Sequence, residues 1–127
     1  MNDLRNPLGR ARGLGSAKAG AGHWWMQRIT AVALVALGIW FVVMLLTLLH
    51  ADYATAHAVL ARPWNAVLMI CFTTAMFWHA ELGLQVVIED YVHTRWLEVS
   101  LMVLIKLLAA LFAIACALAV LRVALTG

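Results

Sequence analysis

The sequence predicts an all-α integral membrane protein with three transmembrane helices. Three observations lead to this fold class: a strongly apolar composition, three long apolar segments, and basic residues gathered before the first of them. The 127 residues are 65% apolar and 12% charged, with a mean hydropathy of +0.93. A soluble chain carries roughly 25% charged residues. The composition therefore excludes a soluble globular enzyme and a disordered protein, and the two cysteines form no zinc or disulfide pattern.

The first predicted helix covers residues 29–49, a run of 21 residues without a charge. At 1.5 Å per residue this run extends ~31 Å, enough to cross the hydrocarbon core of a bilayer. The segment is rich in β-branched valine and isoleucine, which in water would favour a strand. In lipid every backbone polar group must be paired within the segment, so we predict a helix.

The second and third predicted helices cover residues 63–88 and 96–121. Pro63 suits a first helical turn, because its missing N–H is not needed there. The start of the third segment contains two charges, Glu98 and Lys106, which shorten its uncharged run. Two tryptophans lie where interfacial anchors belong: Trp64 and Trp96.

The distribution of basic residues predicts the orientation. Residues 1–28 hold five Lys and Arg against one acid, whereas residues 50–62 hold one basic residue. Excess Lys and Arg remain in the cytoplasm. We therefore expect a cytoplasmic N-terminal segment at 1–28 and a three-helix membrane anchor domain at 29–127. Residues 50–62 would face outward and residues 89–95 inward.

His79 lies near the middle of the second predicted helix. Its neighbours one turn away on the same face, Ala75 and Gly83, are both small. They would leave a shallow slot where a flat ligand could approach the backbone. Neutral imidazole is a common ligand of haem iron. The alternative is a histidine hydrogen-bonded across a helix interface, and both interpretations remain open on these residues alone.

The other four histidines lie at the edges of the spans. If a haem here has two histidine ligands, the second must therefore come from another chain. The sequence would then supply half of a haem site.

Asp90 and Tyr91 follow at the end of the same helix. Eleven residues correspond to three turns and ~20°, so Asp90 falls on the face of His79, ~16 Å further along the axis. A carboxylate and a phenol at the membrane boundary can hydrogen-bond a quinone carbonyl and pass protons. Alternatively, the acidic residues end the helix in water and Tyr91 is an interfacial aromatic residue.

Arg28 precedes the first span on the same side of the membrane. It could pair with haem propionates or a quinone, or its side chain could reach the headgroups. Glu81 lies ~200° around the helix from His79 and cannot ligate the same iron. A carboxylate at that depth must be protonated, partnered or in contact with water, and the sequence assigns it no role. Lys106 could reach the interface or pair with an acid.

Residues 79–93, with the sequence HAELGLQVVIEDYVH, carry a resemblance to a known family. A histidine, a glycine four residues later and Asp-Tyr at eleven and twelve resemble the signature of the D-type hydrophobic anchor subunit of succinate dehydrogenase, complex II. The glycine-rich stretch followed by His23 and Arg28, the chain length and the three-helix topology are also similar to that family.

The resemblance implies that His79 is an axial ligand of a b-type haem, shared with a second, cytochrome b-type anchor subunit in one helical bundle. It places Tyr91 and Asp90 at a ubiquinone site and Arg28 near the haem propionates. The chain would not be an enzyme alone but a subunit of succinate:ubiquinone oxidoreductase. Its expected partners are flavoprotein and iron–sulfur subunits on the cytoplasmic side of a bacterial inner membrane, ubiquinone and membrane lipid, with no nucleic acid.

Three other hypotheses stand beside this one. The chain could be a structural anchor without a cofactor, or the anchor of a related fumarate reductase. A small proton-coupled transporter using Glu81 is a third possibility. The odd number of spans and the Asp90–Tyr91 pair speak against the transporter.

Overall fold

The computed structural model describes residues 20–126 and contains four α-helices. They are α2 (Gly20–Leu48), α3 (Tyr53–Leu60), α4 (Pro63–Tyr91) and α5 (Arg95–Leu125). Helices α2, α4 and α5 are each long and apolar enough to cross a membrane. The described part of the chain contains no strand, so the predicted all-α fold with three transmembrane helices is confirmed.

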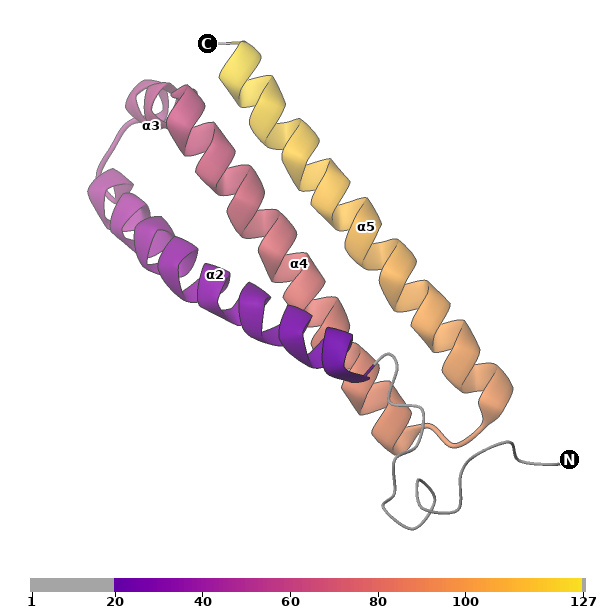
Figure 1. The fold of residues 1–127 in the computed structure, drawn as a ribbon. Coiled ribbons are helices and arrows are strands. Elements are labelled where there is room, and N and C mark those ends of the chain that lie inside the picture. The colour runs from indigo at the N-terminus through magenta and orange to yellow at the C-terminus, as the bar shows by residue number, and fades with distance from the viewer. Residues whose placement is uncertain (1–19, 127) are drawn as a thin grey trace, which may run out of the picture.

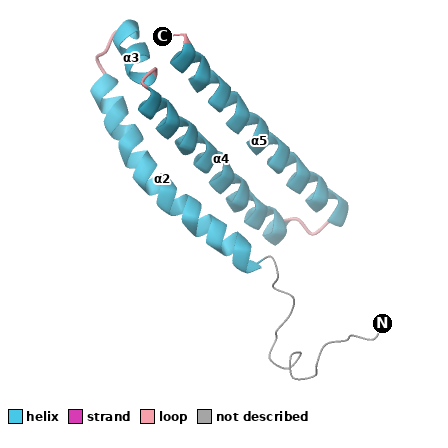
Figure 2. Cartoon of the chain, turned by 45° about the horizontal axis from the view of Figure 1, so that its top comes forward, coloured by secondary structure: helices cyan, strands magenta, loops and turns pink. Residues whose placement is uncertain are grey.

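Helix α4 lies between the other two long helices (Figures 1 and 2). It packs against α2 on one side and α5 on the other, whereas α2 and α5 make no comparable contact. Successive long helices are antiparallel, and the short helix α3 lies at the end where α2 leads into α4. Side chains on opposite sides of α4 therefore meet different partners.

The long helices extend beyond the predicted bounds. Helix α2 begins at Gly20 rather than at residue 29, so the last nine residues of the predicted N-terminal segment are helical. Helix α4 ends at Tyr91 instead of 88, and α5 runs from Arg95 to Leu125 instead of 96 to 121. The prediction stopped near charged residues, but helix ends at the polar headgroups tolerate charge. Residues 1–19 of the predicted N-terminal segment lie outside the described residues.

Helix α3 was not predicted and occupies most of the loop at residues 50–62. The Thr55 N–H donates to Asp52 Oδ1 at 3.1 Å, which caps the first turn of α3. Hydrogen bonds from the side chain and backbone of Thr55 lower the pKa of Asp52. The Asn65 side chain donates to the Val59 carbonyl at 2.8 Å and ties α3 to the start of α4.

Few side chains are buried between the helices. The buried apolar residues in the described chain are Met44, Ala66, Leu82 and Ile88, and the buried polar residues are Thr30 and Glu81. No side chain in residues 20–126 is fully enclosed. Large apolar residues instead cover the outer surfaces, such as Val32 and Ile39 on α2 and Leu107 on α5. In a multi-pass membrane protein such surfaces face lipid or neighbouring subunits.

Candidate functional site

His79 lies on the side of α4 that faces α2. Its Nδ1 atom is 3.0 Å from Oγ1 of Thr30, a residue of α2 that is 6% exposed. The imidazole itself is half-buried. Because Thr30 lies 49 residues from His79 in the sequence, this contact depends on the packing of α2 against α4. The structure thus contains the cross-helix hydrogen bond that was the alternative to ligand binding, but this bond uses only one of the two ring nitrogens.

The two small residues that flank His79 on its face of α4, Ala75 and Gly83, have different surroundings. An apolar groove of about 370 Å³ runs between α2 and α4 and includes Thr30, Ala75 and Trp78 in its wall. On the other side, Gln27 covers Gly83: a Cβ built on this glycine would lie 3.9 Å from Gln27 Nε2. Ala75 therefore borders an open groove, whereas Gly83 is covered by a side chain of α2 that the sequence of α4 alone does not reveal.

Two further polar side chains of α2 lie along the same side as Thr30. Gln27 Oε1 and His23 Nε2 are buried and have no hydrogen-bond partner within residues 20–126. The spacing of 23, 27 and 30 corresponds to i, i+4 and i+7, which is one face of a helix. This polar stripe was missed in the sequence, although its period is visible there.

Asp90 and Tyr91 are the last two residues of α4. The helix persists to this point, so the predicted placement of Asp90 on the face of His79 holds. Tyr91 lies ~18 Å beyond His79 along the helix axis and is 79% exposed. Neither side chain makes a hydrogen bond to another residue of the described chain.

Arg28 does not lie beside His79. It is two residues before Thr30 and therefore points ~200° away around α2. Its guanidinium is exposed and lies 5.6 Å from the centroid of the Trp24 ring, within cation–π distance. Within this chain, the packing thus separates Arg28 from the predicted haem ligand.

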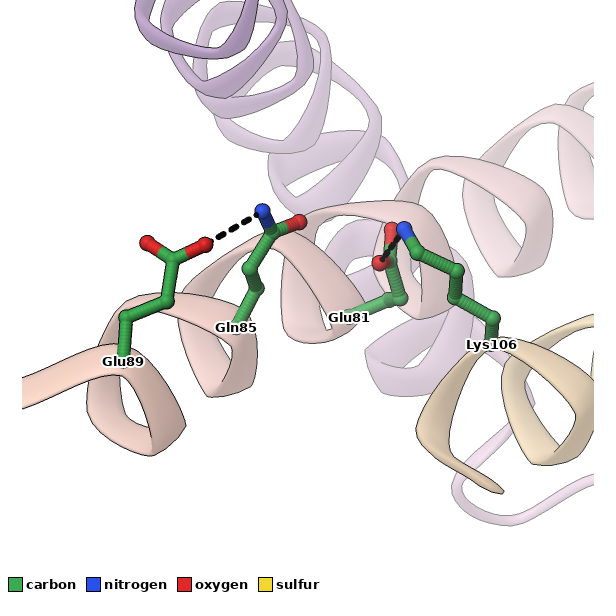
Figure 3. Close-up of polar contacts among 4 residues, drawn as sticks. All are labelled: Glu81, Gln85, Glu89 and Lys106. Carbon is green, nitrogen blue, oxygen red and sulfur yellow. Dashed lines mark hydrogen bonds and ion pairs between the residues drawn. The ribbon is translucent and has the colours of Figure 1, made fainter. Parts of the chain in front are cut away.

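Glu81 forms an ion pair with Lys106 across the interface between α4 and α5 (Figure 3). Lys106 Nζ lies 2.5 Å from Glu81 Oε1, and Glu81 is 8% exposed. One turn apart on α4, Gln85 donates to Glu89 at 2.8 Å. The Glu81–Lys106 ion pair lies on the opposite side of α4 from Thr30, as the ~200° separation of Glu81 from His79 predicted. It explains how a carboxylate is accommodated at this depth.

The donor set around His79 fits one half of a haem site. Across residues 20–126, no three His, Cys, Asp or Glu side chains gather into a metal-binding cluster. His79 Nδ1 lies beside Thr30 Oγ1, and Nε2 makes no hydrogen bond to a residue in that part of the chain. A haem that takes its other axial ligand from a second subunit requires one such nitrogen from this chain.

The fold and the site together define a multi-pass helical membrane anchor with one histidine inside the membrane. Residues 2–121 match the family described as succinate dehydrogenase/fumarate reductase transmembrane subunit. The chain is 36% identical to the succinate dehydrogenase hydrophobic membrane anchor subunit of Rickettsia bellii, over 89% of this chain and 90% of that protein. The corresponding subunit of Paracoccus denitrificans is 31% identical over 67% of this chain and 66% of its own length.

No solved structure shows a significant match. The chain belongs to the family of succinate dehydrogenase/fumarate reductase transmembrane subunits. Its relatives are named as membrane anchors of succinate dehydrogenase, and membership in such a complex implies other subunits.

Proposed function

We propose that this membrane anchor supplies one axial ligand, His79, to a b-type haem and contributes Tyr91 and Asp90 to a ubiquinone site. The observation that carries the proposal is the position of His79. It lies in the middle of a membrane-spanning helix, with Nδ1 held by Thr30 and Nε2 free of any protein partner in residues 20–126. The complex would be a succinate:ubiquinone oxidoreductase, and this chain would not be catalytic alone.

The second axial ligand would come from a second anchor subunit of cytochrome b type. The remaining histidines of this chain lie near the helix ends, away from the depth of His79: His23, His50, His57 and His93. When bound, the haem supplies a one-electron redox centre inside the membrane. His79 would hold its iron through Nε2. Arg28, which points away from His79, would meet propionates or quinone only where a neighbouring subunit completes the site.

Tyr91 would bind ubiquinone at the end of α4. Its phenol can donate a hydrogen bond to a quinone carbonyl, and the adjacent Asp90 carboxylate can accept and pass on a proton. Both side chains are exposed and unpaired within the described chain, which leaves these atoms available for a ligand held between subunits.

The soluble flavoprotein and iron–sulfur subunits would dock on the cytoplasmic side of a bacterial inner membrane. Succinate would be oxidised on the flavoprotein, and electrons would reach the quinone through the iron–sulfur subunit. The five Lys and Arg within residues 1–28 support a cytoplasmic N-terminus and therefore a cytoplasmic position for Tyr91, so the proposed quinone site and the soluble subunits would lie on the same side. The family also includes fumarate reductases, so measuring both reaction directions would assign the physiological one.

The haem ligand is tested by substituting His79 with alanine in the complete complex. We expect the dithionite-reduced spectrum of the purified complex to lose its b-type haem signal, because one axial bond disappears. His50→Ala, an exposed histidine outside α4, is the matched control and should retain the signal. An unchanged spectrum and reduction potential in His79→Ala would contradict the proposal.

A further inference from the structure

The Thr30 hydroxyl lies within hydrogen-bond distance of three atoms. Oγ1 is 2.8 Å from the Met26 carbonyl oxygen, 3.2 Å from the Gln27 carbonyl oxygen and 3.0 Å from His79 Nδ1. A threonine hydroxyl has one hydrogen to donate and two lone pairs with which to accept. The two carbonyl oxygens can only accept. The direction of each hydrogen bond therefore follows from where the single hydroxyl hydrogen lies.

The hydroxyl hydrogen must point toward the carbonyl oxygens of α2. If it pointed at His79 instead, the lone pairs of Oγ1 would face two carbonyl oxygens at 2.8 and 3.2 Å, and the contacts would be repulsive. With the hydrogen directed at Met26 or Gln27, Oγ1 presents a lone pair to His79 and accepts. His79 Nδ1 then carries the ring hydrogen, and Nε2 carries the lone pair.

We infer that Thr30 is a positioning residue for the haem ligand: it fixes the His79 tautomer, directs Nε2 at the iron and tunes the reduction potential. This inference rests on the proposed role of His79. Histidines that bind metals usually donate their other ring N–H to an acceptor, which fixes the ring and raises the basicity of the ligating nitrogen. A hydroxyl that itself donates to a carbonyl is a stronger acceptor, because chained hydrogen bonds polarise one another.

The location of Thr30 suits this role. It is one of two buried polar residues in the described chain, and its rotamer is held because Oγ1 bonds to the carbonyls of the preceding turn. Gln27 and His23 continue the same polar stripe, but Thr30 is the residue of the stripe that accepts the hydrogen bond from His79 Nδ1–H. A more basic imidazole stabilises ferric over ferrous haem, so the hydrogen bond lowers the haem reduction potential.

The test compares Thr30→Val with Thr30→Ser in the complete complex. Valine keeps the shape of the buried side chain but removes the acceptor, whereas serine keeps the hydroxyl. We expect Thr30→Val to raise the haem reduction potential, to change the g-values of the ferric haem in electron paramagnetic resonance, and to lower haem affinity by about 10-fold or more. Thr30→Ser should remain close to the unsubstituted complex in all three.

Parallel measurements on His79→Ala distinguish a failure of the proposed haem ligand from a failure of the role inferred for Thr30. If His79→Ala leaves the haem unchanged, the proposed function fails and the role of Thr30 fails with it. If His79→Ala loses the haem but Thr30→Val retains the unsubstituted potential, g-values and haem content, the role of Thr30 alone is overturned.

Thr30→Ala is a second variant without the hydroxyl, for the case that valine itself disturbs assembly of the complex. If both Thr30→Val and Thr30→Ala fail to assemble while Thr30→Ser assembles, Thr30 acts in helix packing and the inference is overturned.

Discussion

At the scale of single residues, the two proposed sites on α4 differ in how this chain surrounds them. His79 is half-buried against α2 and has a protein partner on one ring nitrogen. Tyr91 ends the same helix with its side chain 79% exposed. The proposed haem ligand is therefore positioned largely by contacts within this chain, whereas any quinone bound at Tyr91 would need neighbouring subunits to enclose it.

Removing the phenolic hydroxyl of Tyr91 should slow quinone reduction. Tyr91→Phe keeps the ring and deletes the hydrogen-bond donor, at a net cost of ~0.5–1.5 kcal/mol, with more lost if a buried acceptor is left unpaired. We expect succinate–quinone reductase activity to fall several-fold. Succinate oxidation with an artificial acceptor that draws electrons from the soluble subunits should be nearly unchanged.

Tyr53→Phe provides a matched control, because Tyr53 is also exposed but lies on α3 at the opposite end of the molecule. It should affect neither activity. Equal loss of both activities in Tyr91→Phe would indicate failed assembly, and unchanged quinone kinetics would remove Tyr91 from the site.

At the scale of helices, the ion pair between Glu81 and Lys106 joins α4 to α5. The Glu81 side chain is 9% exposed and Lys106 56% exposed, so the carboxylate depends on its partner more than the amine does. A carboxylate left unpaired at this depth in the membrane is costly. The pair therefore adds a polar link between α4 and α5 on the side of α4 away from His79.

Breaking this ion pair should destabilise the complex. Lys106→Met leaves Glu81 without its partner, at an expected cost of ~1–3 kcal/mol, read as a lower thermal unfolding midpoint in mild detergent. The double variant Glu81→Gln with Lys106→Met should recover most of the loss, because no unpaired charge remains.

Arg95→Met is the control, since the pairing of Arg95 with Glu98 at 3.8 Å is at the surface and should contribute little. A Lys106→Met complex as stable as the unsubstituted one would show that Glu81 does not depend on Lys106.

At the scale of the whole molecule, three long helices form a single layer with α4 in its centre (Figure 2). Such a layer leaves broad apolar surfaces on either side and encloses no side chain completely within residues 20–126. A multi-pass membrane protein of this shape can bury those surfaces only against lipid or other chains. This agrees with a family whose members are transmembrane subunits of a larger complex.

The orientation of this layer can be measured by cysteine labelling. In a background with Cys71→Ala and Cys116→Ala, single substitutions Ala51→Cys and Thr94→Cys lie at opposite ends of the long helices. Because basic residues precede the first span, an impermeant thiol reagent added to intact spheroplasts should label the variant at position 51. Labelling at position 94 from the outside would reverse the proposed orientation.

The sequence by itself determined the three spans, their order and the side of α4 on which each polar residue lies. Backbone hydrogen bonds within lipid must close inside each segment, so apolar length alone predicts a helix. The helical period then places Asp90 near the face of His79 and Glu81 on the opposite side.

The tertiary structure decided which residues of other helices contact α4: Thr30 at His79, Gln27 at Gly83 and Lys106 at Glu81. Those contacts depend on how far each helix slides and rotates against its neighbour, which the period of one helix does not contain. Helix α3 and the early start of α2 were missed for a related reason: hydropathy reports what can cross the membrane, whereas a helix continues until its backbone finds other hydrogen-bond partners.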